Sequence, residues 1–229
     1  MAVTVTETLR RLQDALVQRF GHMRRRPEDR RAPEWALVQG LIGSRMPSEA
    51  SSAVADRVLA ECGSWDAVAD LEPDALAKAL KGVRFPNQSA KRVHGVLGAI
   101  RDRVGKVDLS SLADPDTPAA IAWIESLPGA GRKIAAQVVG TTTLDRPALV
   151  LDTHHLRIVA RLGLIDEGED TAAAYDRLMP RLPDAWDAAT IDEHHLLMKE
   201  LGRAVCTPKN PKCPDCPALS LCPTGQART

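Results

Sequence analysis

The 229-residue chain has no continuous run of about 18 apolar residues, so it offers no candidate membrane span. Its first twenty residues carry charges every few positions and lack an apolar signal core followed by a small-residue cleavage site. We therefore expect a cytoplasmic protein without membrane association. In that reducing compartment, disulfide bonds are not expected.

The formal net charge is zero, because 30 Lys and Arg residues are balanced by 30 Asp and Glu residues. Bulk charge therefore weakens any argument for nucleic-acid binding, although phosphate contacts need only a locally positive surface. Arginines do cluster within residues 22–31. This cluster can be read either as a DNA-facing patch or as an ordinary solvated surface.

Convincing strand patterns and repeats of solenoid length are absent from the sequence. Apolar residues instead recur at spacings of three and four, which predicts amphipathic helices separated by proline and glycine breakers. The pattern predicts a mostly α-helical protein, and the length is that of one large domain or two modest ones. The predicted helical segments are 35–43, 51–61, 73–83, 90–104, 118–127, 133–140, about 170–180 and 189–204.

Cysteine is scarce except near the end of the sequence, where four of the five cysteines lie within residues 206–222. Six, two and five residues separate them, so only one closely spaced pair of the kind used in zinc sites is present. Four thiolates on a compact loop favour a [4Fe–4S] cluster, with zinc or unligated thiols as alternatives. The fifth cysteine, Cys62, is expected to be a buried helix residue. The predicted ligands are Cys206, Cys213, Cys216 and Cys222.

A second motif, SLPGAGRKIAAQVVG at residues 126–140, predicts two helices joined by a tight turn. Gly129 and Gly131 would allow positive φ angles and a close approach of the backbone to another molecule. Amides at the start of the second helix favour an anion such as a DNA phosphate. A purely structural hairpin explains the glycines equally well.

Two candidate catalytic residues follow this turn. Lys133 lies near the positive end of the second predicted helix, beside Arg132, and both features favour a lowered amine pKa, as a nucleophilic lysine requires. Asp152 precedes a further predicted helix, where it can be only an N-cap or can also serve as a catalytic carboxylate.

Three motifs together resemble one family, the endonuclease III branch of the helix-hairpin-helix DNA glycosylases. They are LPGAGRKIA at 127–135, LDTHHLR at 151–157 and the cysteine spacing at 206–222. The resemblance covers roughly residues 33–223. It implies an all-α helix-hairpin-helix glycosylase fold in which residues 36–145 form a six-helix barrel. It also implies a second helical domain, which holds the iron–sulfur cluster and consists of residues 1–35 and 146–229.

The resemblance also implies the chemistry. The substrate would be double-stranded DNA with damaged bases or abasic sites, and the damaged base, an oxidised pyrimidine, would be flipped out of the stack. Lys133 would attack the sugar and form an imine, Asp152 would stabilise positive charge on the sugar, and Glu125 would support them. Elimination would then nick the strand. The residues expected to contact DNA are Arg45, Phe85, Gly129, Gly131, Arg132, Lys209 and Lys212.

Two positions depart from the family pattern, and both concern base flipping. Gly43-Ser44-Arg45 aligns with the Ser-Ala-Gln of relatives, so Arg45 replaces a glutamine that fills the gap left by the flipped base. Phe85 falls in Arg84-Phe85-Pro86, which aligns with a Gly-Leu-Tyr stretch that supplies a leucine wedge. If Arg45 fills that gap, we expect it to alter the discrimination among opposing bases, whereas the alternative is that Arg45 only binds a phosphate.

Two other functions fit parts of the sequence. One is a non-enzymatic DNA-structure binder that kept the hairpin and the cluster. The other is a monofunctional mismatch glycosylase, although Lys133 argues against it because a lysine at this position favours a combined glycosylase and lyase. For the endonuclease III-like function we expect a monomer that is associated with the nucleoid.

Overall fold

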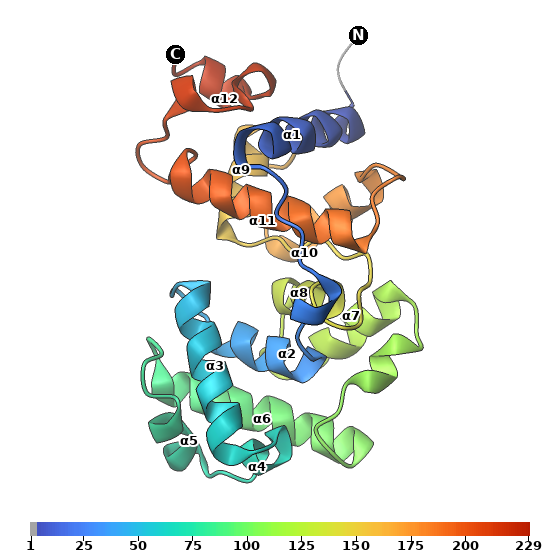
Figure 1. Ribbon diagram of the computed structural model, residues 1–229, viewed down its shortest axis with the longest axis vertical. Coiled ribbons are helices and arrows are strands. Elements are labelled where there is room, and N and C mark those ends of the chain that lie inside the picture. The colour runs from blue at the N-terminus through green and yellow to red at the C-terminus, as the bar shows by residue number, and fades with distance from the viewer. Residues whose placement is uncertain (1–3) are drawn as a thin grey trace. The chain divides into compact units, whose positions relative to one another are not determined.

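The computed structural model describes residues 4–229, which fold into helices joined by loops (Figure 1). Within this range no β-strand forms, and an isolated bridge between Arg31 and Thr142 does not extend into a sheet. The all-α prediction is confirmed. Across the same residues, no helix is long and apolar enough to cross a membrane.

The chain divides into two compact units. Residues 30–146 form one unit, and residues 4–29 together with 147–229 form the other. The segment that precedes the first barrel helix is tied to residues 30–146, so this unit begins a few residues before the predicted domain boundary, which stays a prediction. Arg30 makes an ion pair with Asp145 over 2.9 Å, and Pro33 already begins a buried helix. Residues 1–3 of the predicted second domain lie outside the described residues.

The unit of residues 30–146 is built around one mostly buried helix. Its elements are α2 (Pro33–Ile42), α3 (Ser48–Cys62), α4 (Trp65–Ala69), α5 (Pro73–Ala79), α6 (Pro86–Val104), η2 (Ser110–Ala113), α7 (Thr117–Glu125) and α8 (Arg132–Gly140). α2 buries residues on every side, and such a helix is stable only when other elements surround it. It contacts α3, α6 and α8, while α7 packs on α8 and both α4 and α5 pack on α6.

The other unit joins the two ends of the described chain. Its elements are α1 (Val5–Phe20), η1 (Pro27–Asp29), α9 (Thr153–Arg161), α10 (Thr171–Leu178), η3 (Met179–Arg181), α11 (Ala188–Ala204), η4 (Cys213–Asp215), η5 (Leu219–Leu221) and α12 (Pro223–Gln226). α11 packs against α1 and α9. α9 and α11 approach closely at Gly202, where an added Cβ would lie 2.5 Å from Nδ1 of His154. Gly202 is therefore required by packing.

Three details differ from the sequence-based prediction. The segment 73–83 leaves the helix after Ala79, because Gly82 adopts a φ of 105° in the turn that follows. α1 and α4 were not predicted, although Leu9, Leu12 and Leu16 of α1 show the helical spacing and are fully buried. Cys62 ends α3 and is half-buried, so the prediction of a buried position is wrong.

Candidate active site

The hairpin between α7 and α8 forms as predicted, but its two glycines have different roles. Gly129 has a φ of 82°, so its backbone angle favours glycine, and an added Cβ would also crowd the Arg92 side chain, whose Cγ would lie 3.1 Å away. Gly131 is the N-cap of α8 with a φ of −101°, so the positive φ predicted for it is wrong. An added Cβ there would meet no atom within 4 Å. The start of α8 is open at Gly131.

Arg132 connects the two helices of the hairpin. Its Nε donates to Oε1 of Glu125 over 2.9 Å, and the Arg132 side chain is only 15% exposed. Glu125, the predicted supporting residue, therefore orients Arg132 at the last turn of α7. This ion pair fixes the geometry of the turn, and the predicted DNA contact of Arg132 stays a prediction.

Lys133 lies in the first turn of α8 and is half-buried. Its Nζ donates to Oε1 of Gln137, one helical turn later, over 2.5 Å. Residues four apart lie on the same helical face, so the helix itself holds this amine next to a neutral carbonyl acceptor. The amine is thereby oriented without a carboxylate from its own helix.

Asp152 is the N-cap of α9, as predicted. Its Oδ1 accepts hydrogen bonds from the backbone amides of His154 and His155, both over 2.9 Å. Burial alone would raise the pKa of Asp152, but nearby imidazoles, foremost His195, and the amide of His155 outweigh it and hold the pKa below its ordinary value. The carboxyl group is therefore ionised at neutral pH.

Buried histidines surround this aspartate, and sequence reasoning missed them. His155 is fully buried, and burial lowers its pKa to about 4 despite the opposing charge of Asp152. Its ring lies 5.2 Å from that of His194, whose pKa burial also lowers well below the ordinary value. Nδ1 of His195 contacts the carbonyl of Val150 over 3.0 Å. The available signal was the repeated His-His pair in LDTHHLR and DEHHLL.

The two predicted wedge residues are accessible. Arg45 is exposed in the loop between α2 and α3, where it adopts a left-handed conformation with a φ of 55°. Phe85 is 37% exposed just before α6, and the guanidinium of Arg84 lies 5.6 Å from the centre of its ring. A large exposed apolar side chain is uncommon here, because among the described residues only Phe85 and Val104 stand out in this way.

The four predicted cysteine ligands line one cavity, together with Arg161, Val205 and Pro211. Nη1 of Arg161 lies 3.1 Å from Sγ of Cys206, and the amide of Gly225 donates to Sγ of Cys222 over 3.2 Å. Burial raises the pKa of the Cys216 and Cys222 thiols. Over residues 4–229, no three or more His, Cys, Asp or Glu side chains form a group that could hold a metal ion.

The two loop lysines and the arginine cluster differ in availability. Lys209 and Lys212 are exposed beside the cysteine cavity. In contrast, the arginines from residue 24 to residue 31 have acidic partners. The pairs are Arg24–Glu193, Arg25–Asp192, Arg26–Asp29, Arg30–Asp145 and Arg31–Asp56. This pairing favours the interpretation of the cluster as an ordinary surface rather than as a DNA-facing patch.

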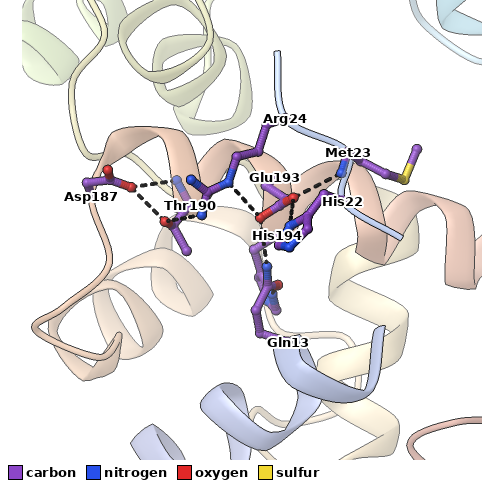
Figure 2. Close-up of polar contacts among 8 residues, drawn as sticks. All are labelled: Gln13, His22, Met23, Arg24, Asp187, Thr190, Glu193 and His194. Carbon is purple, nitrogen blue, oxygen red and sulfur yellow. Dashed lines mark hydrogen bonds and ion pairs between the residues drawn. The ribbon is translucent and has the colours of Figure 1, made fainter. Parts of the chain in front are cut away.

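Figure 2 shows the contacts of Glu193, the most heavily used of these acidic partners. Its side chain is 1% exposed and accepts from the amide of Met23 over 2.9 Å and from Nε of Arg24 over 3.2 Å. Nδ1 of His22 lies 2.9 Å away, and Nε2 of Gln13 lies 3.4 Å away. The buried carboxylate of Glu193 on α11 thus holds residues 22–24, which follow α1, in place through hydrogen bonds.

The comparisons with known proteins agree with this arrangement. The model of the HhH-GPD superfamily of base excision DNA repair proteins matches residues 38–183, and the chain belongs to this superfamily. Endonuclease III of Bacillus subtilis (strain 168) is 37% identical over 103 residues, which is 44% of each chain. Endonuclease III of Thermotoga maritima is 26% identical over 186 residues, which cover 80% of this chain and 79% of that relative.

Solved structures extend the similarity to nearly the whole chain. A trapped covalent intermediate of endonuclease III with DNA matches with a TM-score of 0.79 at 22% identity, over 99% of both chains. A thermostable thymine-DNA glycosylase matches with a TM-score of 0.76 at 17% identity, over 96% of this chain and 97% of that one. The fold is that of helix-hairpin-helix glycosylases. Within the superfamily, the chain is similar to endonuclease III proteins over about four fifths of its length.

Proposed function

We propose that the protein is a bifunctional DNA glycosylase and abasic-site lyase that acts on damaged duplex DNA. The observation that carries the proposal is the placement of Lys133, whose oriented amine lies two residues after the open N-cap of α8. Backbone amides at such a helix start favour a phosphate, so DNA held there would lie near the amine. The family membership supports DNA as the substrate.

The chemistry follows from the residues present. Nζ of Lys133 would attack C1′ of the flipped nucleotide as the bond to the base breaks. The base leaves with the electron pair and takes up a proton, while the amine loses one. Sugar ring opening gives an imine, and loss of a proton from C2′ with breakage of the C3′–O bond nicks the strand. The ionised carboxylate of Asp152 would stabilise the positive charge that develops on the sugar.

We further propose that Cys206, Cys213, Cys216 and Cys222 hold a [4Fe–4S] cluster. Their thiols share one cavity, and an arginine and a backbone amide lie within hydrogen-bond distance of the sulfur atoms, where they would offset thiolate charge. Such a cluster would cross-link a loop that has little apolar core of its own. The exposed Lys209 and Lys212 on that loop would contact phosphates.

We also propose oxidised pyrimidines as the preferred lesions, a monomeric state and a location at the nucleoid. A panel of duplexes that each carry one lesion tests the substrate class. Preference for thymine glycol over an undamaged mismatch supports it, whereas cleavage confined to mismatches supports the second candidate, a monofunctional mismatch glycosylase. The fold that the chain shares with a thymine-DNA glycosylase favours keeping that candidate in the panel.

The lyase is tested by mixing the protein with a duplex that contains one abasic site, in the presence of borohydride. The parent protein should form a covalent complex and should nick the duplex when borohydride is left out. Lys133→Ala should do neither while still folding and binding duplex. A parent protein that binds the duplex but is never trapped would instead be a DNA-structure binder or a monofunctional enzyme.

A further inference from the structure

A chain of side-chain hydrogen bonds begins at the amine of Lys133 and runs away from the hairpin. Nζ of Lys133 donates to Oε1 of Gln137 over 2.5 Å, and Nε2 of Gln137 donates to Oε1 of Gln39 over 2.7 Å. Nε2 of Gln39 then donates to Oγ of Ser51 over 2.7 Å. The hydroxyl of Ser51 donates to the carbonyl of Ser48 over 3.0 Å.

The direction of these hydrogen bonds is set at the lysine. An ammonium group has donors and no acceptor, so Gln137 must present its oxygen to Lys133 and its NH₂ group to the next residue. Gln39 therefore accepts from Gln137 with its oxygen and donates to Ser51 with its NH₂ group. The second hydrogen of Gln137 points to the carbonyl of Ala36 over 3.4 Å. The side-chain amides of Gln137 and Gln39 therefore each have one orientation in which both the oxygen and the NH₂ group are hydrogen-bonded.

Burial makes this chain costly to disturb. Gln39 is 8% exposed and Ser51 is fully buried. A buried amide without hydrogen-bond partners is destabilising, so each of these side chains needs the other as a partner in the largely apolar interior. An apolar pair at these two helix positions would pack with less constraint. The polar chain thus stands out from the core that surrounds it.

The series of hydrogen bonds that starts at Lys133 ends beside the loop that carries Arg45. Gln39 is in the last turn of α2, and its carbonyl accepts the amide of Gly43, where that loop begins. Ser51 lies in the first turn of α3, where the loop ends, and its Oγ would lie 3.3 Å from a Cβ added at Gly43. These hydrogen bonds therefore connect the candidate nucleophile to both ends of the loop at residues 43–47.

We propose that Gln137 and Gln39 are positioning residues for the amine of Lys133 and that they anchor it to the loop that carries Arg45. This inference rests on the proposed lyase function. Gln137 holds Nζ of Lys133 through a neutral oxygen, which orients the amine without adding a charge that favours its protonated form. Gln39 fixes which end of the Gln137 amide faces the lysine.

The test measures single-turnover rates of borohydride trapping on an abasic duplex as a function of pH, together with duplex affinity. Gln137→Glu keeps an oxygen acceptor and adds a negative charge, which should raise the pKa of the Lys133 amine. We expect the pH profile to move by about one unit toward alkaline pH, with a roughly tenfold lower rate at neutral pH. Affinity should change little. Gln18→Glu, at an exposed position on α1, is the matched control and should behave like the parent.

Gln137→Met and Gln39→Met test orientation without adding charge. The first removes the acceptor and should slow trapping at every pH, and the second should have a smaller effect in the same direction. If Gln137→Met does not fold, Gln137→Glu still decides the question. A Gln137→Glu profile that superimposes on the parent overturns the inference and leaves the lyase function standing. A parent protein that traps nothing overturns both.

Discussion

The two compact units are stabilised in different ways. In residues 30–146 the interior is apolar apart from Gln39, Ser51, Ser89 and Thr142. In the other unit the buried polar and charged residues are Thr8, Gln13, His155, Asp192, Glu193, His194 and His195. Burial of a charge or imidazole is tolerated only when partners or loss of charge compensate it. The first unit should therefore respond mainly to changes in packing, and the second to changes in pH, pairing and ligation.

The cysteine loop is the extreme case of this difference. Between residues 205 and 225 the buried residues are few, and they include Val205, Cys213 and Ala218. Apolar burial therefore contributes little to holding this loop, and the proposed cluster would supply a cross-link that keeps its conformation. The candidate nucleophile Lys133, in contrast, is carried by a helix that packs on α2.

The largest difference between the units should follow from removing one cysteine ligand. Cys213→Ala should lose the visible absorption of the cluster and most of the roughly four iron atoms per chain, because four thiolates are needed. Hydrogen exchange should then show residues 205–226 opening. Cys62→Ala, the same change in the other unit, should cost about 1 kcal/mol or less and keep the iron. One zinc and no iron in the parent would contradict the cluster assignment.

The next effect should come from the buried carboxylate in Figure 2. Glu193→Ala removes the shared acceptor of the Met23 amide and of the exposed Arg24 and His22 side chains, and we expect the loss of these hydrogen bonds to lower the free energy of unfolding by about 3 kcal/mol. Glu61→Ala is the control, since Glu61 is 54% exposed and pairs only with Arg57 across 3.4 Å. It should cost at most about 1 kcal/mol. Equal losses in the two variants would remove the distinction between the units.

Acid should destabilise the unit that contains His155 first. Because the pKa of His155 falls from 6.5 to about 4 on folding, the unfolded chain binds more protons between these values. The contribution of His155 to the free energy of unfolding is thus fully present above pH 6.5 and is lost as the pH falls toward 4, by about 3 kcal/mol. Denaturant melts across this range measure the loss, and His155→Gln should reduce it without removing the part that the buried His194 contributes. A parent protein whose stability does not change in this window would show that His155 is not buried as a neutral ring.

The smallest effect should come from the exposed lysines of the cysteine loop. Changing both Lys209 and Lys212 to Ala removes two proposed phosphate contacts, so the slope of log affinity against log salt should fall by up to about two units. Folding and iron content should stay unchanged. Mutating Lys78 and Lys81 to Ala in the other unit gives the matched control. If the slope falls equally in both double variants, the cysteine loop has no special part in binding DNA.

Local patterns in the sequence were enough to predict much of the structure. The helical spacing, the Pro-Gly-Ala-Gly turn and the capping role of Asp152 depend on neighbouring residues, and each is found in the structure. Interactions between residues far apart in the chain were not predictable in this way. Glu193 binds a segment about 170 positions earlier, and Gln39 meets Gln137 from a different helix. Nothing in a local window distinguishes these residues from ordinary surface glutamates and glutamines.

The central claim is that Lys133 is the nucleophile, and one measurement tests it most directly. The parent protein is trapped with borohydride on an abasic duplex, the complex is digested, and mass spectrometry locates the lysine that carries the sugar adduct. We predict that the adduct lies on Lys133, that it forms in stoichiometric yield and that Lys133→Ala gives none. An adduct on another lysine, or trapping of Lys133→Ala at the parent rate, would contradict the account.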